Sequence, residues 1–89
     1  MKRTILSAPA FERRLVRFIK LHRDIKGEIM SVIRILSKDV SHPSLKTHKL
    51  HGRVGKSYAC SINYDYRIVF SYDDKFIYLK SIGNHDDVY

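Results

Sequence analysis

The chain has 89 residues, of which 44% are apolar and 11% aromatic, enough for one hydrophobic core and too few for two, so we expect a single domain over residues 1–89. Seventeen Lys and Arg residues outnumber nine Asp and Glu residues, and the net charge of +8 favours a polyanionic or acidic partner: nucleic acid, an anionic membrane surface or an acidic protein. No apolar run approaches the ~18 residues of a membrane span, and charges return too soon for a secretory signal, which indicates a cytoplasmic protein.

The first predicted element is a short strand over residues 3–8, followed by a helix. Ser7 is placed to cap this helix, and Pro9 suits its first turn because the proline ring fixes φ near the helical value. Apolar residues then recur at helical spacing from Phe11 to His22, while basic residues occupy the other faces. This pattern predicts an amphipathic helix of about four turns.

A second amphipathic helix is predicted directly after the first. The chain turns around Arg23 and Asp24, with Asp24 as a cap, and apolar residues from Ile25 to Val40 have the spacing of one buried helical face. Two helices joined this closely predict an antiparallel hairpin. Residues 1–40 hold ten basic and only four acidic residues, so the helical half carries most of the positive charge.

The second half of the chain has the pattern of a sheet. Pro43 ends the helical pattern because it lacks a backbone donor and disfavours helix at the residue before it. Apolar and polar residues then alternate with a period of two, and Cys60 lies among them as an expected packing residue. Strands are predicted over residues 57–64, 66–72 and 75–82. The order of elements predicts an α+β fold, in which an antiparallel helical hairpin packs on a mostly antiparallel sheet of three to four strands.

Residues with acid–base and phosphate-binding chemistry concentrate after Ser41. One group surrounds His48 and His51 and contains the cations Lys46, Lys49, Arg53 and Lys56. A second group begins a strand, and a third ends the chain: Asp65, Tyr66 and Arg67, then His85, Asp86, Asp87 and Tyr89. Histidine, carboxylate, arginine and tyrosine are the side chains that move protons and stabilise a charged phosphate at neutral pH.

A metal site is disfavoured by the same residues. On a strand, the spacing of His48 and His51 would place them on opposite faces, and no other ligand pair matches a zinc pattern. We therefore expect neither a metal nor another cofactor. Each candidate also has an ordinary structural interpretation: an exposed loop histidine for His48, a turn residue for Asp65, and an ion pair with Asp65 or a partner's carboxylate for Arg67.

The segments HKLHG, DYRIVF and IGNHDDVY, separated by strands, resemble the RelE/ParE superfamily of bacterial toxins, and most closely its YafQ-type mRNA interferases. The resemblance covers nearly the whole chain. It implies a RelE-like fold and a toxin of a type II toxin–antitoxin pair, which enters the ribosomal A site and cleaves mRNA there. It also implies an acidic antitoxin that occupies the basic surface and forms a hetero-oligomer with the toxin.

The resemblance assigns roles to individual residues. The positions that match the family's catalytic pattern are His48, Asp65, Arg67, His85 and Tyr89. Two positions depart from it, because Ser61 and Ser81 stand where the pattern has a histidine and an arginine. These losses bear on catalytic strength rather than on the fold.

Metal-independent RNA cleavage requires a base for the 2′-hydroxyl, cations around the phosphate and an acid for the leaving oxygen. Our hypothesis makes His85 the acid, Asp65 and His48 the pair that accepts or orients the proton, and Arg67 with Lys49 the phosphate clamp. Tyr89 would stack on a base or align the backbone. Further RNA contacts are predicted at Lys46, Lys49, Arg53, Lys56 and Tyr66, and antitoxin contacts at Arg13, Arg14, Arg17 and Lys20.

Two other functions share this scaffold. A ParE-like toxin that inhibits DNA gyrase would not need His85, Asp65 or His48, and their joint presence argues against it. A degenerate toxin that acts only through antitoxin binding and repression is kept open by Ser61 and Ser81.

Overall fold

The computed structural model describes residues 2–51 and 56–84. The described chain begins with one strand, continues with a helical segment and ends with four further strands. In chain order the elements are β1 (Thr4–Ser7), α1 (Pro9–Leu21), the 3₁₀ helix η1 (Arg23–Ile25), α2 (Lys26–Lys38), the 3₁₀ helix η2 (Pro43–Leu45), β2 (His48–Leu50), β3 (Ser57–Ser61), β4 (Tyr66–Tyr72) and β5 (Phe76–Asn84). Among these described elements, no helix is both long enough and apolar enough to cross a membrane.

All five strands form one sheet in the order β1-β5-β4-β3-β2. Strands β2 to β5 are antiparallel to their neighbours, whereas β1 pairs with β5 in parallel. The chain between these parallel strands runs over residues 8–75 and contains both helices and β2 to β4, so it is far longer than the dozen or so residues that a parallel pair requires. The predicted α+β class is confirmed, with four strands after the helices, and β1 joins them as a fifth strand that makes the sheet mixed.

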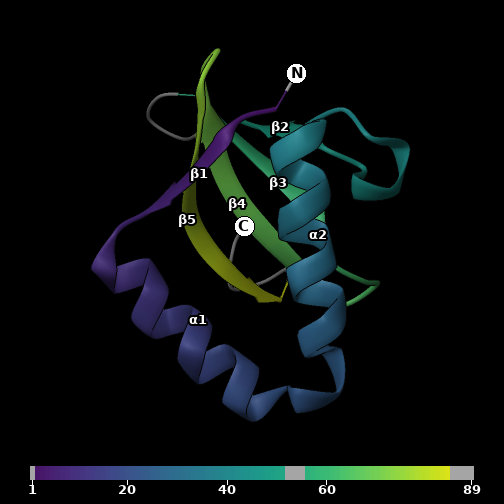
Figure 1. The fold of residues 1–89 in the computed structure, drawn as a ribbon. Coiled ribbons are helices and arrows are strands. Elements are labelled where there is room, and N and C mark those ends of the chain that lie inside the picture. The colour runs from purple at the N-terminus through teal and green to yellow at the C-terminus, as the bar shows by residue number, and fades with distance from the viewer. Residues whose placement is uncertain (1, 52–55, 85–89) are drawn as a thin grey trace.

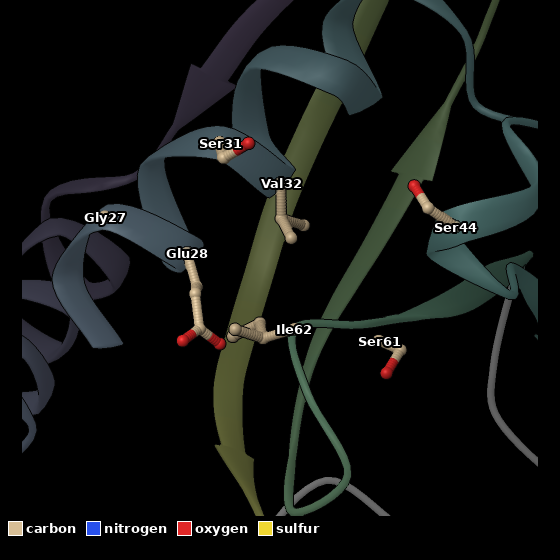
Figure 2. Close-up of a pocket in the computed structure, with 7 residues that line it drawn as sticks. All are labelled: Gly27, Glu28, Ser31, Val32, Ser44, Ser61 and Ile62. Atoms are coloured by element: carbon tan, nitrogen blue, oxygen red, sulfur yellow. The ribbon is translucent and has the colours of Figure 1, made fainter. Parts of the chain in front are cut away.

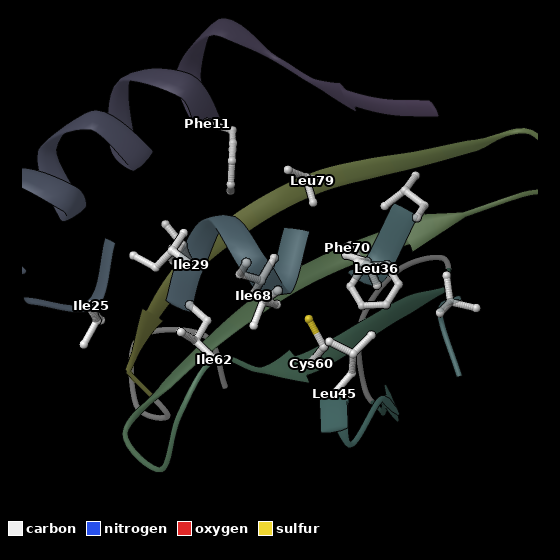
Figure 3. Close-up of a cluster of buried hydrophobic side chains, with 14 residues drawn as sticks. Phe11, Ile25, Ile29, Leu36, Leu45, Cys60, Ile62, Ile68, Phe70 and Leu79 are labelled. Atoms are coloured by element: carbon white, nitrogen blue, oxygen red, sulfur yellow. The ribbon is translucent and has the colours of Figure 1, made fainter. Parts of the chain in front are cut away.

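Both helices cover one face of the sheet and diverge from η1 (Figure 1). The apolar stripe of α2 reaches the sheet through Ile29 and Leu36, which are fully buried against Ile68 and Phe70 of β4 (Figure 3). Cys60 lies in the same core, and burial raises the pKa of its thiol to about 12. Its predicted packing role is confirmed, since the reactive thiolate is strongly disfavoured there.

The opposite face of the sheet carries a smaller apolar cluster. Leu50, Ala59 and Val69 are buried there, and Ser57 is only 3% exposed beside the ammonium of Lys80, whose Nζ donates to Ser57 Oγ at 3.0 Å. Strand β3 is therefore buried on both faces, whereas the period-two alternation of its sequence is typical of a strand with one buried face. We call this the open face, because both helices lie on the other side (Figure 1).

Three local predictions were wrong. Ser7 does not cap α1 because it still pairs with Leu79 in the sheet, and the cap position is Ala8 without a side-chain bond. Asp24 lies inside η1 and does not cap α2, whose cap position is Ile25. Strand β3 ends at Ser61 rather than at residue 64, because the Ile62 N–H donates to the Tyr66 carbonyl and starts a bend.

Candidate functional site

The register of the sheet gathers several candidate residues on the open face. Arg67 pairs with Ser61 of β3 and with Gly83 of β5, and directly paired residues of antiparallel strands share a face. His48 pairs with Ala59, two residues before Ser61, so it lies on the same face and diagonal to Ser61. The sheet thus places His48 and Arg67 on one face, with β3 between their strands.

The bend between β3 and β4, residues 62–65, is held by Asn63. Its Oδ1 accepts from the backbone N–H groups of Asp65 at 2.9 Å and Tyr66 at 3.0 Å, and Ser61 Oγ donates to the Asn63 carbonyl at 2.9 Å. The carboxylate of Asp65 takes no hydrogen bond or ion pair within the described part of the chain and is exposed. A neutral amide therefore fixes the bend and leaves the Asp65 carboxylate accessible.

Arg67 fixes the same bend from the start of β4. Its Nη1 donates to the carbonyls of Asn63 at 2.6 Å, Tyr66 at 3.0 Å and Tyr64 at 3.2 Å. The acceptors are backbone carbonyls rather than the Asp65 carboxylate, so the Arg67–Asp65 ion pair, given above as an alternative structural interpretation, is not formed among the described residues. All three bonds use Nη1, which leaves Nε and Nη2 for a phosphate.

Tyr66 lies on the helix-covered side of β4. Its ring meets Phe18 edge-on at 5.1 Å between centroids and lies 4.8 Å from the His22 ring. Phe18 and His22 are themselves 4.3 Å apart. This cluster joins the end of α1 to the start of β4, so Tyr66 has a packing role, and its role in RNA binding stays a prediction.

The predicted phosphate clamp of Arg67 with Lys49 does not fit the register. Lys49 pairs with Tyr58, whose ring packs in the main core, so Lys49 belongs to the helix-covered side of the sheet. Arg67 belongs to the open face, because successive strand residues alternate. Lys46 and Lys56, for which RNA contacts are predicted, are exposed. His85, Tyr89 and Arg53 lie outside the described residues.

The α1 cations form a separate basic surface near the end of β5. Arg13, Arg14 and Arg17 line a hollow of about 310 Å³, and Lys20 is exposed further along the helix. Arg14 Nη1 donates to Ser81 Oγ at 3.3 Å. This contact brings a guanidinium from α1 to a position in β5 that pairs with Val69 of the open face.

A cavity of about 320 Å³ lies between α2, η2 and the end of β3 (Figure 2). Its lining contains no cation and a single carboxylate: Gly27, Glu28, Ser31, Val32, Ser44, Ser61 and Ile62. Such a lining does not attract a phosphate. The described residues also contain no group of three or more His, Cys, Asp or Glu side chains that would hold a metal ion.

Sequence reasoning missed Asn63, Tyr64 and the Arg14–Ser81 contact. Asparagine is common in turns, so Asn63, followed by Tyr64 and Asp65, was a signal that the strand ends before these residues. Tyr64 ends the strand predicted over residues 57–64, but in the structure it lies in the bend and is 93% exposed. No local pattern reports the Arg14–Ser81 contact, since the two residues are 67 positions apart.

Comparison with known proteins gives one family and several structures. The family model described as "Bacterial toxin of type II toxin-antitoxin system, YafQ" matches residues 3–89. No curated protein matches the sequence.

Among solved structures, YafQ from E. coli strain BL21(DE3) superposes with a TM-score of 0.82 at 14% identity, over 99% of each chain. The YoeB dimer from Staphylococcus aureus gives 0.77 at 20% identity, over 96% of this chain and 99% of that chain. The E. coli DinJ–YafQ toxin–antitoxin complex gives 0.81 at 14% identity, over 100% of this chain and 99% of that chain. At these identities the superpositions confirm the predicted fold.

Proposed function

The chain belongs to the YafQ family of bacterial type II toxin–antitoxin toxins, and from this premise we propose that it is a metal-independent endoribonuclease that cleaves mRNA in the ribosomal A site. One observation carries the proposal. The register places His48 and Arg67 on the open face, and the bend before β4 carries an exposed Asp65 carboxylate two residues before Arg67. A histidine, a guanidinium and a carboxylate available to the open face of a basic protein are the groups that this proposal requires.

The proposed mechanism begins with the 2′-hydroxyl of the substrate RNA. Asp65 and His48 accept or orient its proton, so that the oxygen attacks the adjacent phosphorus and the bond to the 5′-oxygen breaks. Arg67 holds the phosphate through Nε and Nη2, since Nη1 is engaged with the bend. His85 donates the proton to the leaving oxygen and Tyr89 stacks on a base; both roles rest on the family pattern.

The basic helix α1 supplies a further cation in this scheme. Ser81 stands where the family pattern has an arginine, and Arg14 donates to its hydroxyl. We assign Arg14 the electrostatic part of the missing arginine's role at this point. Arg14→Ala is expected to lower cleavage roughly 10- to 100-fold, with the neighbouring Arg13→Ala as the matched control. Equal cleavage by the two variants would remove Arg14 from the scheme.

The test of the function is a cleavage assay on translating ribosomes with mapped mRNA ends, run beside naked mRNA. His85→Ala is expected to lower cleavage by at least ~100-fold, because a placed acid or base contributes about 10² to 10⁴. Folding is checked by circular dichroism. Cuts within coding regions only on ribosomes support the proposal, whereas an unchanged rate in His85→Ala would contradict the assigned acid.

A second candidate is a toxin homologue without catalysis, which acts by antitoxin binding and repression. Ser61 and Ser81 favour it, because they replace a histidine and an arginine of the family pattern. The same assay separates the candidates, since a non-catalytic homologue produces no new mRNA ends. Intact mRNA with DNA damage signalling would instead indicate the gyrase-inhibiting alternative.

We propose that the partner is an acidic antitoxin and that both act in the cytoplasm. The DinJ–YafQ complex shows that a protein of this fold is held by an antitoxin. Here the exposed cations of α1, at positions 13, 14, 17 and 20, form a basic surface for Asp- and Glu-rich segments. Exposed charges are screened by salt, so the rate of association is expected to fall as ionic strength rises.

A further inference from the structure

A second basic hollow, of about 340 Å³, lies at the β2 edge of the sheet. This volume is within the range of about 300 to 1,000 Å³ that is usual for ligand sites. Two lysines, two histidines and two tyrosines contribute to its wall, and no carboxylate does. The lining residues are Val40, Ser41, His42, Pro43, Lys46, Thr47, His48, Lys49, Tyr58 and Tyr72.

The aromatic part of this wall is held in place by its neighbours. The rings of Tyr58 and Tyr72 lie 5.0 Å apart, and Tyr58 stacks on the buried Phe70 at 5.9 Å. The guanidinium of Arg3 lies 5.0 Å over the Tyr72 ring. Both tyrosines are half-buried, so each keeps some surface open while its ring position is fixed.

The cationic part of the wall is also held in a set conformation. Thr47 Oγ1 donates to the Val40 carbonyl at 2.7 Å, and the Lys46 N–H donates to the Pro43 carbonyl at 3.3 Å. His42 Nδ1 accepts from the Ser44 N–H at 3.1 Å, which leaves Nε2 of the neutral ring as a donor. Little ordering of this segment would be required when a ligand binds.

Lys46 adopts a backbone conformation that lysine disfavours. Its φ is 50°, and it is the one non-glycine residue with positive φ among those the structure describes. Glycine or asparagine would adopt this left-handed conformation more readily. A disfavoured residue in a well-held segment points to a use of its side chain, and the Lys46 side chain borders the hollow.

We propose that this hollow binds one nucleotide of a single RNA strand, with the phosphate between Lys46 and Lys49 and the base against Tyr58 and Tyr72. The proposal rests on RNA being the substrate of the site on the open face. A nucleotide engages both parts of the wall, because lysines contact the phosphate and an aromatic ring offers a stacking surface for any base. Carboxylates of an acidic peptide would engage only the lysines.

The position of His48 connects the two sites. His48 lines the hollow, and its register places it on the open face with Arg67. An RNA strand that crosses the β2 edge of the sheet at His48 therefore contacts both the hollow and the site on the open face. Apart from His48, the residues of the hollow fix the path of the RNA beyond the scissile phosphate and bind it without taking part in cleavage.

The test is a titration of the full ¹⁵N-labelled chain with a 2′-O-methylated hexanucleotide, which lacks the attacking hydroxyl and cannot be cleaved. Resonances of residues 46–49, 58 and 72 are expected to shift. Lys46→Gly is expected to raise Kd by at least about fivefold while keeping or raising Tm, since glycine favours the left-handed conformation. Lys49→Ala is expected to raise Kd similarly, and Lys75→Ala is the matched control in the β4–β5 turn.

Three results would overturn the proposal: shifts that avoid the hollow, an unchanged Kd in Lys46→Gly, or hollow shifts produced by a Glu-rich peptide and not by the oligonucleotide. Failure of the proposed nuclease function is seen separately. A chain that binds the oligonucleotide in the hollow but does not cut translated mRNA would retain this site and contradict the reaction.

Discussion

The bend before β4 and the turn after it are built on the same hydrogen-bond pattern. Asn63 Oδ1 accepts from the N–H groups two and three residues ahead, at 2.9 and 3.0 Å. Asp73 Oδ1 does the same at 2.9 and 2.8 Å. An arginine then fixes each one, Arg67 through three carbonyls and Arg3 through the Asp73 carbonyl at 2.7 Å.

The difference lies in which side chain does the capping. In the later turn the carboxylate itself is the cap, and Asp73 Oδ2 also accepts from the Tyr78 hydroxyl at 3.0 Å. In the earlier bend an amide is the cap, and the Asp65 carboxylate is left exposed. One end of β4 thus uses its acid for structure, whereas the other holds its acid available for chemistry.

The largest expected effect separates these two ends by activity. Asp65→Asn keeps the backbone bond to Asn63 and removes only the charge, so cleavage on ribosomes is expected to fall at least ~100-fold while Tm stays unchanged. Asp74→Asn, at an exposed acid of the other turn, is the control and should cleave normally. Equal cleavage by both variants would mean that the ends do not differ in function.

The next effect concerns the two arginines. Arg67→Ala removes three hydrogen bonds from a charged donor to the bend, and the free energy of unfolding is expected to fall by about 1.5–3 kcal/mol. Arg3→Ala removes one such bond and a ring contact and should cost less. Urea denaturation measures both, and a larger loss in Arg3→Ala would reverse the ranking of the two ends.

Much of the fold was predictable because it depends on local periodicity. The stripe from Ile25 to Val40 and the strand around Ile68 followed from spacing alone, since a buried face repeats at the period of its element. The parallel pairing of β1 with β5 was not predictable in this way, because it joins residues 4–7 to 76–79. The cap assigned to Ser7 failed for the same reason, since Ser7 pairs with Leu79, whereas the cap assigned to Asp24 failed because the local turn η1 contains Asp24 and moves the start of α2 to Lys26.

The candidate site was less accessible from sequence. Motif and residue type made Asp65 and Arg67 candidates, but only the bend shows that Arg67 donates to carbonyls rather than to Asp65. Lys49 and Arg67 lie on opposite faces of the sheet. The face of Lys49 depends on the register of the three-residue edge strand β2, which the sequence does not reveal. Distant contacts such as Arg14 with Ser81 depend on how α1 lies against β5, which no local pattern encodes.

A smaller effect is the response of the two turns to pH. Hydrogen bonds from the N–H groups of Lys75 and Phe76 and from the Tyr78 hydroxyl lower the pKa of Asp73 below 3.8. Its stabilising contribution is therefore present above pH 3.8 and is lost as the pH falls through the lowered pKa. Asp73→Asn is expected to flatten the acid limb of a plot of Tm against pH.

The reciprocal change sharpens this prediction. Asn63→Asp should add an acid limb at the earlier bend, because a carboxylate there would accept the same two N–H groups. The pKa of Tyr78 is raised above 10.0 by its bond to Asp73, so its contribution is complete below pH 10.0 and is lost as the pH rises further. Identical Tm profiles for Asp73→Asn and the natural chain would contradict the role of the carboxylate.

The smallest expected effect is on stability, when a tyrosine associated with either end of β4 is replaced. Tyr64 is 93% exposed, so Tyr64→Ala is expected to change the free energy of unfolding by no more than about 0.5 kcal/mol. Tyr78→Ala removes the hydroxyl that donates to Asp73 and should lower Tm measurably, with Tyr78→Phe isolating that bond. Thermal unfolding of the three variants is the measurement. A stability loss in Tyr64→Ala would show that its ring supports the bend, whereas an unchanged Tm agrees with the RNA contact that we propose for this end of β4.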